Sequence, residues 1–311
     1  LTKLGTYEVK IFANDSYGNS NSSSEGFLVQ DNTPPGIKVI QPEQDPYTTG
    51  NTSVEIEFNI TNAEDLRDLK HNWNGTNFTL YDNSLVGIWN FDNISLLGEN
   101  STYVVDNSRN SNNGFVYGEG DEVSSGALMY GNSGLELDGS GDYVDFGDID
   151  EIDLSSNQDV TYSMWFKHDG LSGSQDLFDK RESGDKGIGS RYSSGELRAY
   201  LYYDVGREKY SVEYAHSSTD EWFHYSVSID RDGNMSMYID GSLVDSVDIS
   251  DDSSTDLSTS NSLIIGYKSL DTSSFSYFNG SIDEVMIFNR SLNVEEIQQL
   301  YMSNLRKYDS N

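Results

Sequence analysis

Short segments in which apolar and polar residues alternate recur along nearly the whole chain, and this pattern constrains the fold most. Residues 54–60 read VEIEFNI, so their apolar side chains fall on one face of an extended segment. Residues 228–244, SIDRDGNMSMYIDGSLV, hold two tight-turn pairs, Asp232-Gly233 and Asp240-Gly241, between alternating segments. An apolar period of two, broken by Gly, Asn, Asp and Ser, predicts an all-β fold.

One segment near the end of the chain departs from this pattern. Residues 293–302, NVEEIQQLYM, place Ile297, Leu300 and Tyr301 on one face of a helix. Asn293 is a suitable N-cap, and Glu296 occupies the capping-box position. The sequence therefore predicts one short C-terminal helix.

The charge balance excludes several classes of partner. The 311 residues include 52 Asp and Glu against 19 Lys and Arg, a formal net charge of −33. Such a chain has no basic surface for DNA or RNA, and anionic membranes are excluded for the same reason. No apolar run is long enough to span a bilayer, so no membrane insertion is expected. Cations, sugars and other proteins remain as partners.

The absence of cysteine and the first residues of the sequence do not indicate the cellular compartment of the protein. The chain has no cysteine, so disulfides do not stabilise it. No signal peptide opens the sequence, and Leu1 is not an initiator methionine. We therefore expect a mature product or a fragment.

Glycosylation sequons give a stronger indication of location. The pattern Asn-x-Ser/Thr predicts glycosylation in an extracellular, cell-surface protein, although a chain rich in Asn and Ser also produces it by chance. The sequons begin at Asn14, Asn21, Asn51, Asn59, Asn74, Asn77, Asn93, Asn100, Asn234, Asn279 and Asn289.

The strand pattern restarts twice along the chain. Residues 1–30 hold two strands and end at DNTPPG, whose prolines cannot donate ladder hydrogen bonds. Residues 31–83 hold a few more strands, too few to form two sheets. From about Leu85 to Tyr301 the chain is one long unit with about a dozen strands, as in a jelly roll.

An ordered series of motifs in this long unit resembles the laminin-G-like, or concanavalin A-like, jelly-roll family. The series consists of GIWNFD (87–92), VVDNSRNSNNGFVYG (104–118), LELDGSGDYVDFG (135–147), VTYSMWFK (160–167), EWFHYSVSIDRDGNMSMYIDG (221–241) and FNGSIDEVMIFNRSLNVEEIQQLY (278–301). The resemblance implies a laminin-G-like jelly-roll sandwich over residues 84–304, followed by a linker at 305–311.

The first part of the chain resembles immunoglobulin-like modules of microbial surface proteins. YEVKIFANDSYGN (7–19) is similar to the motif that closes such a module, and TPP (33–35) to the start of the next. Residues 1–30 are then closing strands and residues 31–83 opening strands of an incomplete immunoglobulin-like sandwich, into which the jelly roll is inserted. The chain is cut from a tandem array, or copies complete each other by strand addition, or both pieces join within one chain.

The resemblance also implies a structural calcium ion. The family's first and last strands lie together, which would bring Asp92 near Asp283, with Asn113 of the Asn-rich loop adding an oxygen ligand. Asp142 is a second candidate because the family keeps an acidic residue there. The alternative is that these side chains bond backbone amides at turns.

The aspartate-rich stretch LDGSGDYVDFGD, residues 137–148, leaves three interpretations open: a metal site, a catalytic carboxylate pair, or a polar turn. Catalysis has little support nearby. Jelly-roll glycosidases need two carboxylates, commonly as E-x-D-x-x-E on one strand. Glu151 and Asp153 begin that pattern, but position 156 is serine. The sequence therefore predicts no enzyme and no catalytic residue.

Function is predicted from these pieces together. The leading hypothesis is a structural or adhesive surface glycoprotein, a repeating unit of a filament or sheath in which copies join head to tail by strand complementation. The alternative is a carbohydrate-binding module of a larger secreted protein. Candidate loop aromatics for glycans are Tyr192, Tyr267, Phe275, Tyr277 and Phe278, whereas Trp89, Trp165 and Trp222 are expected in the core.

Overall fold

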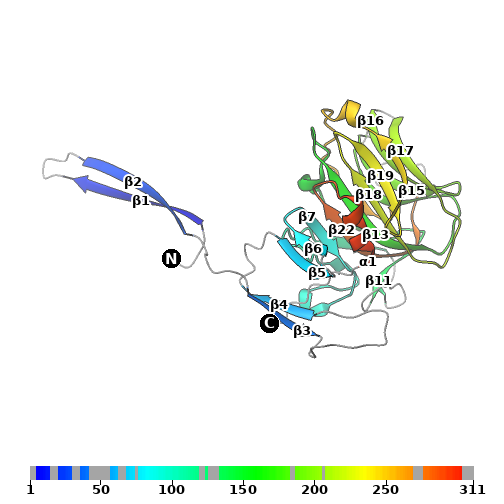
Figure 1. Ribbon diagram of the computed structural model, residues 1–311, viewed down its shortest axis with the longest axis horizontal. Coiled ribbons are helices and arrows are strands. Elements are labelled where there is room, and N and C mark those ends of the chain that lie inside the picture. The colour runs from blue at the N-terminus through cyan, green and yellow to red at the C-terminus, as the bar shows by residue number, and fades with distance from the viewer. Residues whose placement is uncertain are drawn as a thin grey trace. The chain divides into compact units, whose positions relative to one another are not determined.

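The structure of the chain is a computed structural model, and its description covers most of the jelly roll and several separate strands. The described residues are 5–14, 20–29, 36–41, 57–61, 68–73, 76–118, 123–124, 133–182, 186–204, 207–268 and 276–302. The chain divides into two compact units, residues 1–67 and 68–311 (Figure 1).

The first unit contains two antiparallel pairs of strands. In one, β1 (Gly5–Asn14) pairs with β2 (Ser20–Val29). In the other, β3 (Gly36–Gln41) pairs with β4 (Glu57–Thr61). These pairs lie where the sequence predicts strands. Because the described strands of this unit do not combine into one sandwich, the immunoglobulin-like interpretation stays a prediction.

The second unit begins with another hairpin, β5 (Asp68–Trp73) and β6 (Thr76–Asp82). Sequence analysis assigns these strands to the module that ends at residue 83, whereas the compact unit that contains them runs from Asp68. Strand β6 contacts the C-terminal helix, and this contact accounts for the grouping.

One sheet of the jelly roll, here called sheet I, has β22 near its centre. Its order is β10-β11-β22-β13-β18-β19-β20, and β7 also pairs with β22. The first and last strands of the jelly roll therefore lie together, as predicted, with Trp89 opposite Val285. The strands are β7 (Leu85–Trp89), β10 (Val123–Ser124), β11 (Gly134–Asp138), β13 (Val160–His168), β18 (Phe223–Ile229), β19 (Asn234–Ile239), β20 (Ser242–Asp248) and β22 (Asn279–Phe288).

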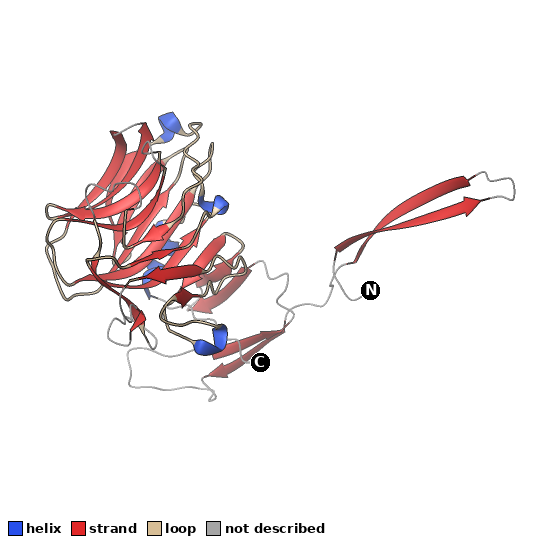
Figure 2. Ribbon diagram, turned by 180° about the vertical axis from the view of Figure 1, so that it is seen from behind, coloured by secondary structure: helices blue, strands red, loops and turns tan. Residues whose placement is uncertain are grey.

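The opposing layer, sheet II, has the order β17-β16-β15-β14-β21-β12-β9-β8. Its strands are β8 (Tyr103–Val104), β9 (Gly114–Tyr117), β12 (Tyr143–Asp145), β14 (Ser174–Arg181), β15 (Gly187–Ser193), β16 (Glu196–Asp204), β17 (Arg207–Ala215) and β21 (Ile264–Ile265). Two antiparallel sheets face to face confirm the predicted all-β jelly roll, and Figure 2 shows how strands dominate it.

Both predicted tight turns connect neighbouring strands of sheet I. The pair Asp240-Gly241 joins β19 to β20 with φ values of 49° and 72°, as a two-residue hairpin turn requires. The turn at Asp232-Gly233 joins β18 to β19 and is closed by a hydrogen bond from the Gly233 amide to the Asp230 carbonyl.

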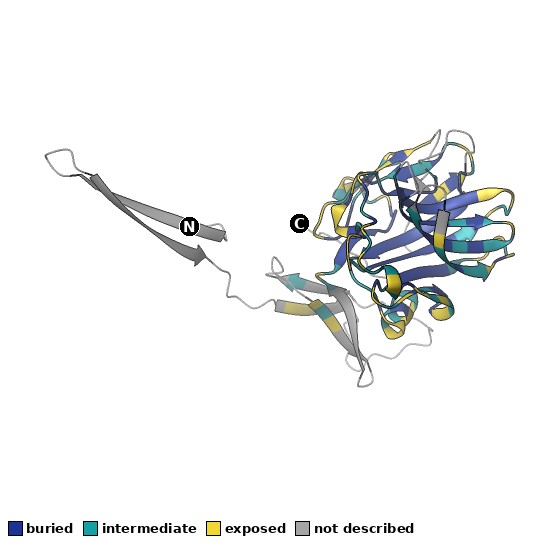
Figure 3. Ribbon diagram, turned by 90° about the horizontal axis from the view of Figure 1, so that it is seen from above, coloured by how far each residue is buried: buried dark blue, intermediate teal, exposed yellow. Residues whose placement is uncertain are grey.

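The core lies between the two sheets, and Figure 3 shows the buried residues concentrated in the strands of the jelly roll. Trp89 is fully buried there, as predicted, and its indole covers Gly87. A Cβ at residue 87 would stand 2.2 Å from the Trp89 ring, so only glycine fits beneath the indole. Trp165 is also buried, but Trp222 is only half-buried, with the Lys167 ammonium 5.9 Å from its ring.

The single α-helix of the described residues, α1 (Val294–Met302), packs on the outer face of sheet I. Its capping box forms as predicted: the Glu296 amide donates to Asn293 Oδ1, and the Asn293 amide donates to Glu296 Oε2, both at 3.0 Å. Ile297 and Leu300 pack in a second apolar cluster with residues of β7, β19 and β22, and Tyr301 contacts Trp165. No described helix is long and apolar enough to cross a membrane.

Candidate functional site

The aspartate-rich stretch 137–148 crosses from sheet I to sheet II, since β11 pairs with β22 and β12 pairs with β9 and β21. Three of its four carboxylates, those of Asp138, Asp142 and Asp145, cap turns. Asp142 Oδ2 accepts from the Asp138 amide at 2.9 Å, and Asp145 Oδ1 accepts from the Gly147 amide at 2.8 Å. The charge is therefore concentrated at the crossing because the turning backbone needs acceptors for its exposed amides.

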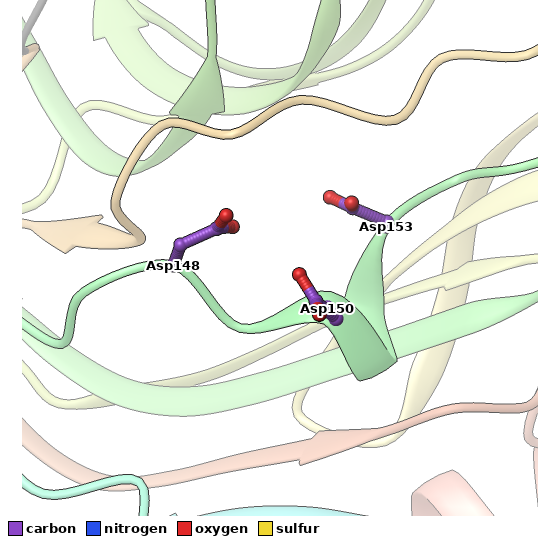
Figure 4. Close-up of side chains that lie close together, drawn as sticks. All are labelled: Asp148, Asp150 and Asp153. Carbon is purple, nitrogen blue, oxygen red and sulfur yellow. The ribbon is translucent and has the colours of Figure 1, made fainter.

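Just beyond this crossing, three carboxylates converge (Figure 4). Oxygens of Asp148, Asp150 and Asp153 all lie within 4.8 Å of one another, a spacing at which carboxylates can hold a metal ion. Asp150 belongs to the short helical turn Asp150–Ile152, which Asp153 directly follows.

A cation of the protein itself already lies against this acidic triad. Lys180, only 1% exposed, places its Nζ 2.7 Å from Asp148 Oδ1 and 3.2 Å from Asp153 Oδ1. The same ammonium donates to the Asn261 carbonyl at 3.0 Å. Burial raises the pKa of Asp153, and Lys180 opposes that rise. We therefore interpret the triad as the counter-charge of a buried lysine.

The incomplete glycosidase pattern that begins with Glu151 and Asp153 lies at this same helical turn, Asp150–Ile152. Glu151 is exposed in the helical turn, and Asp153 is paired with Lys180, so neither stands on a strand facing a cleft. Paired glycosidase carboxylates require a shared face and room for a sugar between them. This placement does not supply such a face.

The predicted calcium ligands lie at several places. Asp92 and Asp283 are buried at the same end of the β7–β22 pair. Asp92 accepts from Asn90 Nδ2 at 2.8 Å, and Asp283 Oδ1 accepts from the Glu284 amide at 2.9 Å. Asn113 Oδ1 accepts from the Asp106 amide at 2.9 Å, so this oxygen supports its own loop.

A buried glutamate that sequence analysis missed adds charge beside Asp92. Glu99 accepts from the Ile94 amide at 2.7 Å and the Val105 amide at 3.3 Å. Burial raises the pKa of Glu99, and the charge of Asp92 raises it further. Among the described residues, however, Asp92, Asp142 and Asp283 do not form a group of three with oxygens within 4.8 Å, so the calcium assignment stays a prediction.

The outer face of sheet II carries a row of aromatic side chains that no described helix covers. Tyr117 and Tyr143 stack with ring centroids 4.8 Å apart, Tyr143 lies 5.4 Å from Tyr267, and Tyr267 stacks on Tyr277 at 4.4 Å. Phe115 and Tyr103 extend the row, with centroids 5.3 Å apart. We call these residues the aromatic row: Tyr103, Phe115, Tyr117, Tyr143, Tyr267 and Tyr277.

Strand β9 makes one end of the aromatic row accessible. Its residues alternate, with Val116 in the core and the two aromatics outside, where Phe115 is 58% exposed and Tyr117 is 46% exposed. Elsewhere in the row the rings stack on each other and are half-buried. Burial raises the pKa of Tyr143, and Tyr117 and Asp145 raise it further, so its hydroxyl stays neutral. The row thus offers apolar rings and uncharged hydroxyl groups together.

The loop aromatics predicted for glycan binding divide between core and surface. Tyr192 and Phe278 are buried in the core, which corrects that prediction, because their neighbouring residues face outward on alternating strands. Tyr267 and Tyr277 belong to the aromatic row, and Phe275 lies outside the described residues. Sequence analysis predicted a strand at FVYG, residues 115–118, but did not name Tyr103, Phe115, Tyr117 and Tyr143 as candidate binding residues; the alternation in FVYG was the available signal for the two on β9.

The predicted glycosylation sites are accessible where the structure describes them. Asn93, Asn100 and Asn234 are exposed, and Asn279 and Asn289 are half-buried. The other six sites lie outside the described side chains: Asn14, Asn21, Asn51, Asn59, Asn74 and Asn77.

Comparisons with known proteins agree with this architecture. Residues 138–298, which are 161 of the 311 residues, match the concanavalin A-like lectin/glucanases superfamily. No curated protein matches the chain. The similar solved structures include the receptor binding domain of botulinum neurotoxin C/D mosaic serotype, at TM-score 0.55 and 19% identity over 70% of this chain and 51% of that chain.

Two further similar structures are complexes with ligands. The binding domain of botulinum neurotoxin DC in complex with rat synaptotagmin II has TM-score 0.55 and 15% identity, covering 70% of this chain and 51% of that one. The serotype D ligand binding domain with N-acetylneuraminic acid has TM-score 0.52 and 21% identity, covering 70% and 50%. The chain thus spans about half the length of the structures it matches, and at this identity the likeness concerns the fold.

Proposed function

The chain belongs to the concanavalin A-like lectin/glucanases superfamily, and from this premise we propose that it is a non-enzymatic carbohydrate-binding module of an extracellular, cell-surface glycoprotein. The aromatic row on the outer face of sheet II carries the proposal. Phe115 and Tyr117 expose aromatic surface that a monomeric domain usually buries, and such patches mark interaction sites.

The chemistry of the row favours a glycan as the occupant. A sugar presents apolar C–H faces and many hydroxyls, and it is matched by rings that carry hydroxyl groups of their own. The net charge of −33 opposes nucleic acids and anionic lipids. Among the similar structures, one binding domain is described with a sugar and another with a protein, which supports a binding role without locating the site.

Glycan binding is tested on the full chain with an array of surface polysaccharides, followed by calorimetry on those retained. Phe115→Ala with Tyr117→Ala should weaken binding by at least about tenfold, because hot-spot aromatics carry most of an interface's energy. Leu96→Ala is the matched control, since Leu96 is an exposed apolar residue, 75% exposed, outside the row. Binding that survives the double change, or no binding to any glycan, would contradict the proposal.

A structural calcium ion would be held by Asp92 and Asp283 at the end of the β7–β22 pair, near Asn113, with Asp142 as a separate candidate. The two buried carboxylates at one end of the pair support this assignment. Asp92→Ala with Asp283→Ala should lower the melting temperature only when calcium is present. An unchanged melting temperature of the wild type after chelation would remove the site.

A second candidate function is assembly into a filament or sheath, with copies joined by strand complementation. Its support is the set of two-stranded pairs β1–β2, β3–β4 and β5–β6, to which no other described strand adds. Isolated two-stranded sheets are marginal in water, and their open edges accept further strands. Electron microscopy of native material should show residues 1–30 completing a neighbouring copy; strands that pair only within their own chain would reject assembly.

A further inference from the structure

A polar pocket lies on the outer face of sheet I, lined by β18, β19, the turn between them, and the segment from residue 290 to the first turn of α1. Its volume is about 570 Å³, within the range of about 300–1,000 Å³ that is usual for small-ligand sites. The aromatic row lies on the other sheet, so the pocket is a separate place on the jelly roll.

Strand alternation makes the floor of this pocket polar. The core-facing side chains of β18 and β19 are apolar, so Ser228 and Ser236, which pair in register, point to the outer face. Ser236 Oγ lies 2.9 Å from Ser246 Oγ of β20, and Thr161 Oγ1 of β13 lies 3.3 Å from Ser228 Oγ. Hydroxyl groups therefore stand in register across four neighbouring strands, and two of them belong to the pocket.

The wall on the side of α1 is fixed by hydrogen bonds and supplies apolar surface. Ser228 Oγ donates to the Leu292 carbonyl at 2.9 Å, and the Leu292 amide donates to Thr161 Oγ1 at 2.9 Å. Leu292 and Tyr238 are both buried in the apolar cluster under α1, and both line the pocket. The pocket is thus formed without a ligand and combines a polar floor with an apolar edge.

The one arginine of the pocket is not available to an anion. Its Nη1 and Nη2 donate to Glu296 at 2.9 and 2.8 Å, and its Nε and Nη2 donate to Asp82 at 3.2 and 2.7 Å. Nη1 of Arg290 also donates to the Ser291 carbonyl at 3.3 Å. All five N–H groups of Arg290 are therefore used within the protein, and none is left for a phosphate or a carboxylate.

The opposite side of the pocket offers groups that can bind a ligand. Main-chain bonds close the β18–β19 turn: the Asp230 amide donates to the Asn234 carbonyl at 3.0 Å, and the Gly233 amide donates to the Asp230 carbonyl at 3.1 Å. The side chains of Asp230 and Asn234 take no part in these bonds. Asn234 is exposed, and its side-chain amide has no hydrogen-bond partner among the described residues.

We propose that this pocket is a second carbohydrate site, which binds one neutral sugar residue through Asp230, Asn234 and Ser236. Sugar hydroxyls donate to a carboxylate and exchange hydrogen bonds with an amide and a hydroxyl, while the C–H face packs on the apolar edge. The carboxylate of Asp230 and the occupied guanidinium of Arg290 exclude an anionic sugar.

The two sites would act together on different glycan chains. Sheets I and II are opposite layers of the sandwich, so the pocket and the aromatic row face away from each other. One jelly roll then joins two glycan chains, a consequence that rests on the proposed function of the aromatic row. Binding in the pocket itself does not depend on the row.

The test uses the full chain, produced without glycosylation because Asn234 begins a sequon. Every protein carries Phe115→Ala with Tyr117→Ala, so that the aromatic row cannot retain the sugar. Saturation-transfer NMR titrations use methyl glycosides of glucose, galactose, mannose and N-acetylglucosamine, with methyl glucuronide as the anionic probe and putrescine as the cationic probe. We expect a neutral glycoside to bind, and methyl glucuronide to bind at least about tenfold more weakly.

Matched variants locate the bound sugar. Asp230→Asn should weaken binding by at least about tenfold and Asn234→Ala by at least about threefold, because hydrogen bonds to a charged group are the stronger ones. Asp169→Asn is the control, since Asp169 is an exposed aspartate that follows β13 at the end away from the pocket. If a variant fails to fold, nuclear Overhauser contacts between the sugar and the Tyr238 ring of the parent protein still place the sugar.

The outcomes for the pocket and for the aromatic row are distinguishable. Absence of binding to every neutral glycoside, a preference for methyl glucuronide or putrescine, or an affinity retained in both pocket variants would overturn this proposal. None of these results bears on the polysaccharide test of the row, which is made with Asp230 and Asn234 unchanged. Failure of that test would in turn leave binding in the pocket standing.

Discussion

The two sheets of the jelly roll use their outer faces in opposite ways. On the outer face of sheet I, α1 covers an apolar cluster, in which Ile297 is buried with Leu85, Ile88 and Phe288. The outer face of sheet II carries the aromatic row, in which Phe115 and Tyr117 stay exposed. Each outer face carries a group of apolar side chains, but among the described residues only the group on sheet I is covered by a helix.

The covered face is also anchored electrostatically. The guanidinium of Arg290 donates to Glu296 of the helix at 2.8 Å and to Asp82, at the end of β6, at 2.7 Å. Beneath the helix, His224, Ser163 and Ser226 form a buried hydrogen-bonded chain. We infer that the apolar residues on the outer face of sheet I stabilise the fold, whereas the exposed Phe115 and Tyr117 on the outer face of sheet II remain available for a ligand.

Removing the main helix contact should have the largest effect on stability. Ile297→Ala creates a cavity under α1 and should lower the free energy of unfolding by about 2–5 kcal/mol, as measured by urea denaturation. Met302→Ala on the same helix is the control, since Met302 is 78% exposed. Equal effects of the two changes would show that α1 does not seal sheet I.

Lys180 is buried and paired with carboxylates, and it belongs to neither of the two outer faces, so its substitution provides a comparison for them. Lys180→Met leaves Asp148 and Asp153 without their cation and should cost about 2–3 kcal/mol, less than a fully buried pair because Asp148 is partly exposed. Added Ca²⁺ should recover part of this loss in the variant alone. A calcium response of the wild type that depends on Asp150 would instead make the triad a native metal site.

The polar chain under the helix should make sheet I sensitive to acid. Burial lowers the pKa of His224 from 6.5 to about 3, so the unfolded chain binds a proton that the folded chain does not. The stability contribution is complete above pH 6.5 and is lost as the pH falls toward 3. At pH 5 the loss is about 2 kcal/mol. His224→Gln should remove this part of the pH dependence between pH 7 and 5; an unchanged profile would contradict the assignment.

The smallest effect on stability is expected for a substitution on the outer face of sheet II. Phe115→Ala should change the free energy of unfolding by less than about 0.5 kcal/mol, as expected for exposed residues. A loss comparable to that of Ile297→Ala would mean that the aromatic row is part of the structure rather than a free surface. Denaturation of the two variants in parallel decides between these outcomes.

Local sequence patterns were sufficient to predict the secondary-structure elements. The alternation of apolar residues predicted the strands, Asp240-Gly241 predicted its hairpin, and Asn293 with Glu296 predicted the helix start. These features depend on neighbours within a few residues, where backbone periodicity and capping act. The ordered motifs also identified the jelly roll correctly.

The sites depend on contacts that no local pattern encodes. The carboxylates of LDGSGDYVDFGD looked like ligands, but the crossing between sheets turned them into caps, and Lys180 approached Asp148 from 32 positions away in sequence. Likewise, Tyr117 and Tyr143 meet only because β9 and β12 pair.

By itself, the sequence determined the fold class, the strands, the helix and the acidic surface, because periodicity, capping and charge are properties of neighbouring residues. Tertiary structure alone decided which apolar face α1 covers, which aromatics form a row, and that Asp230, Asn234 and Leu292 line one pocket. The physical reason is that strand pairing and sheet packing join residues far apart in the chain, and binding sites are made from those junctions.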